Sequence, residues 1–363
     1  MTNSPSAFFA ERQPAAVLKH GILRRYLQPF ASKTGMTAPG RRVVYLDGYA
    51  GPGTYDDGMP GSPALAEQTA KRIAGSRELQ GIYVEKDPDM YEQLCEMLDG
   101  FDNWIAYNDT IANCLPDVMT EVGKAPLFAF MDPFGLPVPF TDLVAHLLSR
   151  PVSQKTEVLI NFSVPGLKRN AGQLMSKKDY PAKASVIRGV NDRLGGHWWQ
   201  DVWRDSDEGE REELVLEGYV KRLAAAGTGG WGWWTIPVSR RPQGNPIYHL
   251  VFLTRHRDGL WQFNEALSGA LEEYHDLCHQ GRLDLDPLEE REKRWIAEIE
   301  ANITTLLASG SFILGRKLDV VCGGSLGYAR EKHLRRAVKN LHTQGATSTN
   351  GVGKMQKMRI DPS

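Results

Sequence analysis

Glycines and an acid follow the first strand-like run of the chain, in the string DGYAGPGT from Asp47 to Thr54. The apolar run VVYL before it is typical of a strand, and GSPALAEQTAKRIA after it is typical of a helix. At such a turn a nucleotide-type cofactor can lie against the backbone, because Gly51 and Gly53 give clearance and unusual dihedral angles. The helix N-terminus behind them favours an anionic group. We expect a cofactor site here, with a purely structural turn as the alternative; its candidate residues are Asp47, Gly48, Tyr49, Gly51 and Gly53.

Two acids follow the next two strand-like runs. Glu85 ends IYVEKD, where a carboxylate can accept hydrogen bonds from both hydroxyls of a cofactor ribose. Its separation from Gly53 exceeds the roughly 20 residues usual in dinucleotide folds, and the insertion DDGMPGSP accounts for the excess. Asp109 ends the third run and is the candidate contact to an adenine amino group. A solvated carboxylate at a strand end is the alternative for Glu85.

The string MDPFGLPVPF, from Met131 to Phe140, follows the fourth strand-like run. It occupies the place of the (D/N)PP(Y/F) motif of amino-directed methyltransferases, and it is similar to the DPFGSPxPF element of tRNA guanosine dimethyltransferases. This likeness implies that Asp132 accepts hydrogen bonds from an exocyclic amine, next to Pro133, while Phe134 stacks on the base. Aiming the nitrogen lone pair at a methyl sulfonium is mostly a positioning task. A structural Pro–Gly turn is the alternative.

The glycine string also resembles a methyltransferase element. It is similar to the D-P-F-x-G-S-G-T loop of amino-directed DNA methyltransferases, with Gly48 and Tyr49 in place of Pro and Phe. The resemblance implies that the cofactor is S-adenosylmethionine, with the methionine carboxylate as the anionic group.

Short apolar runs alternate with helical patterns through this part of the chain. A helix is expected near residues 14–34, with Ser62 as N-cap of the next and Pro63 as its first residue. This alternation predicts a parallel sheet covered on both faces. WWTIPVSR and YHLVFLTRH, joined by RPQGNPI, predict an antiparallel final pair. The expected fold is therefore α/β, a class I methyltransferase (Rossmann-like) mainly parallel sheet, over residues 1–286 with a helical insertion around 165–230.

Residues 287–363 carry a charge asymmetry that the net charge of -1 hides. From Gly310 onward there are ten Lys or Arg against three acids. Three helices and then a strand pair in TSTNGVGKMQKMRI are the order of a winged helix-turn-helix, with YAREKHLRRAVKNL as recognition helix and NGVGK as wing. A solvated face or a protein-binding winged helix is the alternative. The candidate nucleic-acid-binding residues are Lys332, Arg335, Arg336, Lys339, Lys354 and Lys357.

Several motifs in order resemble the three-Cys-motif partner (TcmP) family over roughly residues 15–275. They are DGYAGPGTYDDGMPGSP, VEKD, LFAFMDPFGLPVPF, EVLINF and YHLVFLTRH. The resemblance implies a methyltransferase-like fold, a phage, mobile-element or defence setting, and a three-Cys-motif radical-enzyme-like partner protein. It does not fix a reaction, because fold does not imply function.

The composition is that of an ordinary globular protein, with 41% hydrophobic and 24% charged residues. The four cysteines are far apart and form no zinc pattern, so we expect reduced thiols, no metal and a cytoplasmic protein. No apolar run is long enough for a bilayer, so no membrane partner is expected.

Three functions stay open. The first is an S-adenosylmethionine-dependent methyltransferase of an exocyclic amine on a DNA or RNA base, which must be flipped out of a duplex. The second is a non-catalytic nucleic-acid-binding partner of another enzyme. The third is a metal-dependent nuclease that uses Asp47, Asp56, Asp57 and Asp132.

Overall fold

The computed structural model describes residues 14–55, 58–178, 181–240, 244–279 and 286–363. The chain divides into two compact units. Unit 1 contains Leu27–Arg255, and unit 2 contains Pro14–Tyr26 and His256–Ser363. The expected first helix is present as α2 (Pro14–Thr34), which contributes residues to both units.

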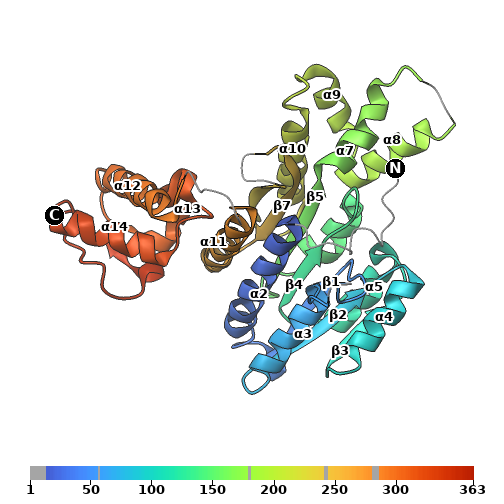
Figure 1. The fold of residues 1–363 in the computed structure, drawn as a ribbon, viewed down its shortest axis with the longest axis horizontal. Coiled ribbons are helices and arrows are strands. Elements are labelled where there is room, and N and C mark those ends of the chain that lie inside the picture. The colour runs from blue at the N-terminus through green and yellow to red at the C-terminus, as the bar shows by residue number, and fades with distance from the viewer. Residues whose placement is uncertain (1–13, 56–57, 179–180, 241–243, 280–285) are drawn as a thin grey trace. The chain divides into compact units, whose positions relative to one another are not determined.

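Unit 1 is built on a seven-stranded sheet with the order β3-β2-β1-β4-β5-β7-β6 (Figure 1). The strands β1 to β5 pair in parallel, while β7 is antiparallel to both β5 and β6. The predicted mainly parallel sheet with an antiparallel end is therefore confirmed, and the fold is methyltransferase-like. The strands are β1 (Arg42–Asp47), β2 (Glu78–Val84), β3 (Trp104–Tyr107), β4 (Leu127–Met131), β5 (Thr156–Ser163), β6 (Gly232–Ser239) and β7 (Pro246–Thr254).

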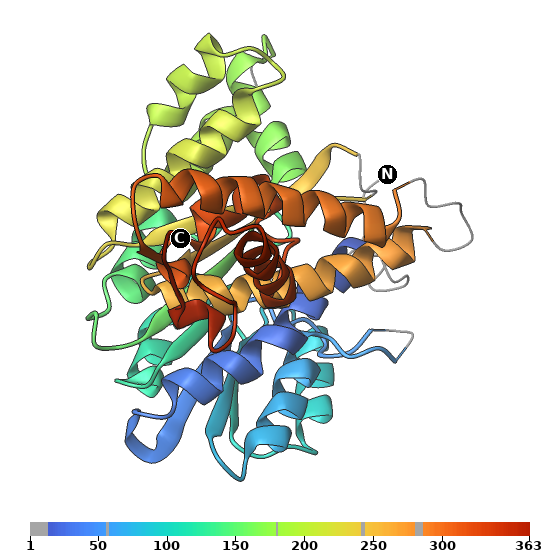
Figure 2. The same cartoon turned by 90° about the vertical axis from the view of Figure 1, so that its left-hand side faces the viewer.

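Helices cover both faces of this sheet (Figures 1 and 2). Side chains alternate along β1, so Val44 and Leu46 enter an apolar core with the helix that follows β3. Tyr45 points to the other face and stacks on Phe128, which contacts Phe30 of α2. The connecting helices are η1 (Pro39–Arg41), α3 (Ser62–Ile73), α4 (Pro88–Leu98), α5 (Ile111–Val122), α6 (Phe140–Asp142) and the π-helix η2 (Leu143–Leu148).

The expected helical insertion lies between β5 and β6. Its elements are α7 (Val164–Ala171), η3 (Gly172–Met175), α8 (Lys183–Leu194), α9 (Trp198–Asp205) and α10 (Arg211–Ala226). Trp199 and Tyr219 are fully buried and join the core beneath the sheet's last parallel strands. The indole nitrogen of Trp199 donates to Asn191 of α8 at 2.9 Å. The insertion is thus a packed layer of unit 1.

Unit 2 contains α11 (Arg257–His279) and a small C-terminal core. The elements of this core are α12 (Leu288–Leu307), β8 (Phe312–Ile313), η4 (Leu314–Arg316), α13 (Leu318–Cys322), η5 (Gly323–Ser325), α14 (Glu331–Thr343), η6 (Met355–Lys357) and β9 (Arg359–Ile360). Trp261 of α11 is 3% exposed and belongs to this core. Asn264 accepts from the Gly327 N–H and donates to the Ala329 carbonyl, both at 2.7 Å. In unit 2, α11 is therefore packed and hydrogen-bonded to the C-terminal elements, whereas the sequence suggests a junction after residue 286.

Two local expectations differ from the structure. The N-cap of α3 is Gly61, and Ser62 is the first helical residue; its hydroxyl bonds Asp47. The expected strand pair in residues 347–360 is reduced to an isolated bridge between Thr347 and Pro362 and to β9, which pairs with β8. Gly351 and Gly353 have φ of 75° and 116°, so the chain turns where a strand would need extended backbone.

Candidate functional site

A cavity of about 620 Å³ opens in unit 1 at the carboxyl ends of the parallel strands. Its walls are the segments that directly follow β1, β2, β3 and β4, together with residues of α7 and α8. Ligands of open α/β sheets bind at this edge, because the loops there are free to vary while the strands fix their starting points. Six of the ten residues predicted for cofactor and catalysis line it: Gly48, Tyr49, Glu85, Asp109, Pro133 and Phe134.

Asp47 lies behind the cavity wall. It is fully buried and accepts hydrogen bonds from the Tyr45 hydroxyl (3.0 Å) and the Tyr49 N–H (3.2 Å). Burial raises the pKa of this carboxyl to about 6, against the lowering effect of its hydrogen bonds. Asp47 therefore fixes the start of the glycine loop, and its contact with a cofactor stays a prediction.

Gly51 and Gly53 also lie behind the wall. Both have positive φ, 61° and 81°, as the sequence predicts for this turn. A Cβ on Gly53 would come within 2.4 Å of the Met97 side chain, on α4. The absence of a side chain on Gly53 therefore gives room to Met97 of α4, and the clearance expected for a cofactor stays a prediction.

Glu85 lines the cavity and connects several polar groups there. It is 7% exposed, and its two carboxylate oxygens accept from the N–H of Gly51 (2.9 Å) and the N–H of Asp87 (2.8 Å). The Asn108 amide donates to the Glu85 carbonyl at 2.9 Å, which ties the ends of β2 and β3 together. A carboxylate has about four lone-pair sites, so two hydrogen bonds leave capacity for two ligand hydroxyls.

Asp109 stands at the end of β3 and is exposed to the cavity. Its Oδ1 accepts from the Thr110 N–H (2.6 Å) and from the Asn113 amide (2.9 Å). This orients the carboxylate at the start of α5, where a negative charge is favourable.

Asp132 follows β4 and is held by the neighbouring strand. The Asn161 amide of β5 donates to its Oδ1 at 2.5 Å, and Asn161 itself is 7% exposed. Within the described residues the Asn161 Oδ1 is buried and has no hydrogen-bond partner. Beside Asp132, Pro133 lines the cavity and Phe134 is 59% exposed at it. A fixed carboxylate and an exposed ring thus share one edge.

One aromatic hydroxyl interacts with this carboxylate, and a second interacts with the first. Tyr49 lines the cavity; burial raises its pKa to about 12, Arg193 opposes the shift and Asp132 adds to it. Tyr219 of α10 is fully buried, and its hydroxyl has no partner among the described residues. Burial and the nearby Tyr49 raise the pKa of Tyr219. Both phenols therefore stay neutral near neutral pH and can only donate or accept hydrogen bonds.

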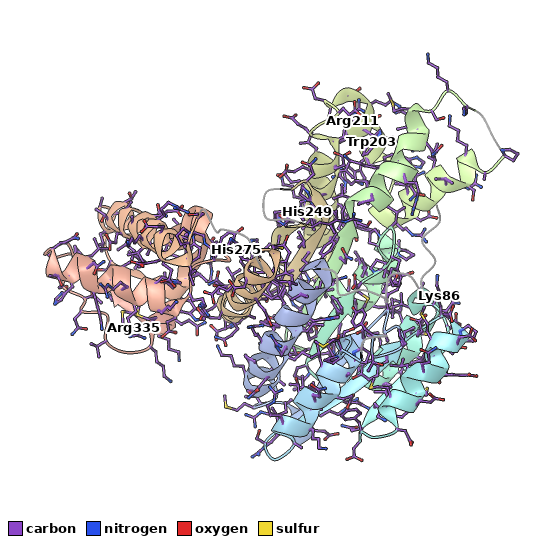
Figure 3. All side chains as sticks on the ribbon, viewed as in Figure 1. Lys86, Trp203, Arg211, His249, His275 and Arg335 are labelled. Carbon is purple, nitrogen blue, oxygen red and sulfur yellow. The ribbon has the colours of Figure 1, made fainter. Side chains whose placement is uncertain are left out.

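Sequence reasoning missed four polar residues of the wall, which are Lys86, Thr110, Asn170 and Arg193. Lys86 follows Glu85 and is exposed (Figure 3). Asn170 of α7 and Arg193 of α8 come from the insertion. Lys86 could have been found from its place after Glu85, whereas no local pattern marks Asn170 or Arg193 because they reach the cavity through tertiary packing.

The six basic residues predicted in unit 2 fall into two groups. Lys332 donates to Glu292 at 2.5 Å, and Arg335 contacts Glu331 (2.6 Å) and the carbonyls of Gly351 (2.7 Å) and Gly353 (3.0 Å) (Figure 3). The other four are exposed, and their side chains have no hydrogen bond or ion pair within the described part of the chain: Arg336, Lys339, Lys354 and Lys357. These four are the ones available to an external anion.

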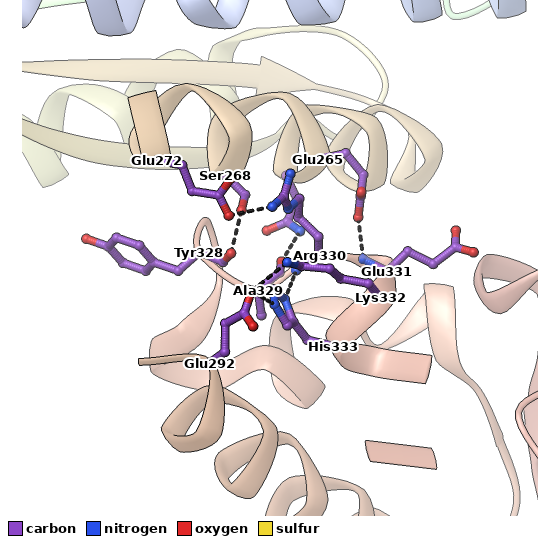
Figure 4. A network of polar contacts seen from close by, with 11 residues as sticks. Glu265, Ser268, Glu272, Glu292, Tyr328, Ala329, Arg330, Glu331, Lys332 and His333 are labelled. Carbon is purple, nitrogen blue, oxygen red and sulfur yellow. Dashed lines mark hydrogen bonds and ion pairs between the residues drawn. The ribbon is translucent and has the colours of Figure 1, made fainter. Parts of the chain in front are cut away.

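A polar network fixes the N-terminus of α14 (Figure 4). The His333 Nδ1 accepts from the Arg330 N–H at 2.8 Å, so its Nε2 carries the proton and donates to Glu292 at 3.0 Å. Arg330 pairs with Glu272 of α11, and the Glu331 N–H donates to Glu265 at 2.7 Å. Lys332 is part of this network and serves the packing of α14.

No group of three or more His, Cys, Asp or Glu gathers as a metal site in the described parts of the chain. Asp56 and Asp57, which the nuclease hypothesis needs, lie outside the described residues. None of the described helices is both long and apolar enough to cross a membrane.

No family model matches the chain, so the resemblance to the three-Cys-motif partner proteins stays a prediction. No curated protein matches it either. Among solved structures, a Legionella pneumophila protein with the family description DUF519 is 11% identical, with a TM-score of 0.42 over 74% of this chain and 94% of that one. An rRNA methylase from Streptococcus thermophilus is 14% identical, with a TM-score of 0.31 over 63% and 93%. Human methyltransferase-like protein 13, solved with SAH, is 12% identical, with a TM-score of 0.35 over 77% and 100%. The strand order, rather than these likenesses, carries the assignment of the fold.

Proposed function

We propose that this protein is an S-adenosylmethionine-dependent methyltransferase that acts on an exocyclic amine of a nucleic-acid base. One observation carries the proposal. The Asp132 carboxylate, fixed by Asn161, stands at the same strand edge as Glu85, next to a cavity of about 620 Å³. A cavity of this size is in the range that takes a drug-sized or cofactor-sized ligand.

The cavity residues fit the cofactor. Glu85 keeps lone pairs for the ribose hydroxyls, and Asp109 is exposed where the adenine end would lie. Gly48 and Tyr49 form the wall after β1, on the side toward Asp132. Asp47, Gly51 and Gly53 act from behind by shaping that wall. When bound, S-adenosylmethionine supplies an electrophilic methyl group.

Asp132 would hold the substrate amine. A carboxylate oxygen accepts a hydrogen bond from the N–H and so orients the nitrogen lone pair toward the methyl donor. The Asn161 amide holds the Oδ1 of this carboxylate and so fixes the direction in which it faces the amine. The exposed ring of Phe134 offers a stacking surface for a base that has left its helix. After methyl transfer the surplus proton can pass to the same carboxylate or to solvent.

We infer that the C-terminal part of unit 2 is a winged helix-turn-helix that binds DNA or RNA. The order α12, β8, α13, α14 and β9, with β8 paired to β9, supports this. Its helix α14 buries Leu334, Val338 and Leu341 and turns Arg336 and Lys339 outward. Helices of this kind lie in a groove and contact phosphates.

Calorimetry with S-adenosylmethionine and its demethylated product tests the cofactor. Transfer of a labelled methyl group to separate pools of RNA and DNA then tests the reaction. Micromolar or tighter binding together with label in one polymer is the expected result. A folded protein that binds neither S-adenosylmethionine nor its demethylated product would contradict the proposal.

A second function has one observation in its favour. Both Glu85 oxygens already accept backbone N–H groups, so this carboxylate has a structural role without any cofactor. A non-catalytic protein that binds nucleic acid and delivers another enzyme would keep the fold and the basic helix. Nucleic-acid binding with no cofactor binding would favour it.

The resemblance to the three-Cys-motif partner proteins implies a radical-enzyme-like partner and a phage, mobile-element or defence setting. We keep both as parts of the proposal, supported by the motif order alone. Affinity purification from cells that express the tagged full chain tests the partner. Recovery of no such protein under mild salt would count against it.

A further inference from the structure

The helical insertion of unit 1 separates its charges into two halves. Residues 164–194, which include α7 and α8, hold seven Lys or Arg and two acids. Residues 198–226, which include α9 and α10, hold four Lys or Arg and eight acids. Like charges that stay close together repel, so such a separation costs stability unless a ligand of opposite charge binds there. The basic half is the one that reaches the cavity, through Asn170, Val186, Gly189 and Arg193.

Most cations of this basic half have no side-chain partner among the residues that the structure describes. Arg169, Lys177, Lys178 and Arg188 are exposed, and their side chains have no hydrogen bond or ion pair within the described ranges. Lys168 pairs with Glu212 of α10 at 3.2 Å, and Lys183 donates to the Ser176 carbonyl at 2.7 Å. We name the four exposed cations, together with Arg193, the α7–α8 surface.

The cavity itself continues this positive charge. Arg193 and Lys86 line it from two sides, and Arg169 and Arg188 each neighbour a lining residue in the chain. A base that reaches Asp132 remains attached to its sugar and phosphates. When the base enters the cavity, the flanking phosphates must therefore lie outside it, beside the residues that line its opening.

We propose that the α7–α8 surface binds the phosphate backbone of the substrate nucleic acid, as a second basic site independent of α14. Phosphodiesters are the ligand because the surface is cationic and lies beside the cavity at which the Phe134 ring is exposed. The inference rests on the proposed function for its substrate, yet it concerns binding and can be tested without turnover.

The test is fluorescence anisotropy of the full chain with a short labelled single-stranded RNA, and with DNA of the same sequence, across a potassium chloride series. The test variant is Arg169→Gln/Arg188→Gln. The matched control is Arg204→Gln/Lys221→Gln, which removes two exposed cations from the acidic half, where Asp201 and Glu217 pair with them. Circular dichroism checks that both variants fold.

The test variant should bind on the order of tenfold more weakly at low salt, and its salt slope should fall by about 1.4, because each single-strand phosphate contact contributes about 0.7. The control should stay within about twofold of the wild type, since its cations are already paired. Equal affinity and slope in the test variant and the wild type would overturn the proposal. Binding of the surface to phosphatidylserine vesicles with no affinity for either oligonucleotide would overturn it as well.

Methyl transfer separates this inference from the proposed function. Loss of nucleic-acid affinity in the test variant, with no methyl transfer by the wild type, would contradict the proposed enzyme activity and support the α7–α8 surface. Methyl transfer by the wild type, with unchanged nucleic-acid affinity in the test variant, would support the enzyme activity and contradict the α7–α8 surface.

Discussion

Asn161 donates a hydrogen bond of 2.5 Å to Asp132 across the paired strands β5 and β4. The two residues are 29 positions apart in the sequence; Asp132 directly follows β4, and Asn161 lies near the carboxyl end of the adjacent strand β5. Because the donor is a buried amide, the Asp132 carboxylate is held in one orientation. A group that must meet a substrate nitrogen at a fixed angle needs such support.

Asp132→Ala should lower turnover by orders of magnitude and leave affinity for S-adenosylmethionine nearly unchanged, because the residue lies on the substrate side. Asp132→Asn should be milder, since an amide oxygen still accepts a hydrogen bond. Asn161→Ala should lower kcat more than it raises KM, because it removes orientation and not contact. Steady-state kinetics and calorimetry check all three. Wild-type turnover in Asp132→Ala would contradict the role.

Glu85→Ala should show the opposite pattern, with weak cofactor binding as the main defect. The change also leaves the N–H groups of Gly51 and Asp87 without their acceptor, at a cost of about 1–3 kcal/mol each. Calorimetry at low temperature, where the variant stays folded, measures the affinity. Asp109→Ala is the milder companion, since its carboxylate is exposed. Unchanged affinity for S-adenosylmethionine in folded Glu85→Ala would show that the cofactor does not bind at Glu85.

Local pattern was enough to predict the sheet and the wall segments that follow its strands. Alternating apolar runs and helices fix a parallel sheet, and the residues after each strand must then meet at one edge. The run TEVLINFS forms strand β5, as its apolar pattern predicts, and nearly every side chain in it is buried. For the same reason Glu85, Asp109 and Phe134 could be placed together from the sequence.

Tertiary packing decided the rest. Arg193 reaches the cavity only because α8 packs against it, and helix periodicity does not report which face will do so. The glycine string predicts a cofactor contact, but it does not reveal that Gly53 also makes room for the Met97 side chain of α4. In unit 2 the basic residues were visible from composition, but their partners Glu292 and Glu331 were not assigned.

Arg335 should act as a positioning residue for the loop after α14. It joins the carbonyls of Gly351 and Gly353 to α14, and Val352 between them is 73% exposed. Arg335→Ala should speed amide exchange over residues 351–354 and weaken nucleic-acid binding. Arg335→Lys should restore little of either property, because a lysine ammonium lacks the planar guanidinium that reaches two carbonyls at once. Arg336→Ala should weaken binding without changing exchange. Hydrogen exchange and anisotropy distinguish the two, and unchanged exchange in Arg335→Ala would refute the role.

The extent of the C-terminal domain can be measured with fragments. Residues 256–363 retain Trp261 and Asn264, which are buried against the C-terminal core, and residues 287–363 lack both. Loss of a buried Trp side chain costs about 3–5 kcal/mol. The longer fragment should therefore melt cooperatively and at a clearly higher temperature in circular dichroism. Equal melting temperatures would support the junction at residue 286 that the sequence suggests.

Glu67 should make stability depend on pH. It is 1% exposed on α3 and accepts from the Tyr83 hydroxyl at 2.6 Å. Burial raises the pKa of Glu67 to about 7 from 4.5, against the lowering effect of that hydrogen bond. The folded state thus holds the proton more tightly than the unfolded state. The stability that this provides is complete below pH 4.5, falls as the pH rises to about 7 and is absent above it.

Glu67→Gln removes this titration and keeps an oxygen that can accept from Tyr83. The variant should gain on the wild type by up to about 3 kcal/mol as the pH rises through that window, since one pKa unit corresponds to about 1.36 kcal/mol. Urea unfolding of both proteins at a pH below and a pH above the window measures the difference. Asp47 titrates in an overlapping range in both proteins, so its contribution cancels in the comparison. A difference between variant and wild type that is the same at both pH values would show that folding does not shift the pKa of Glu67.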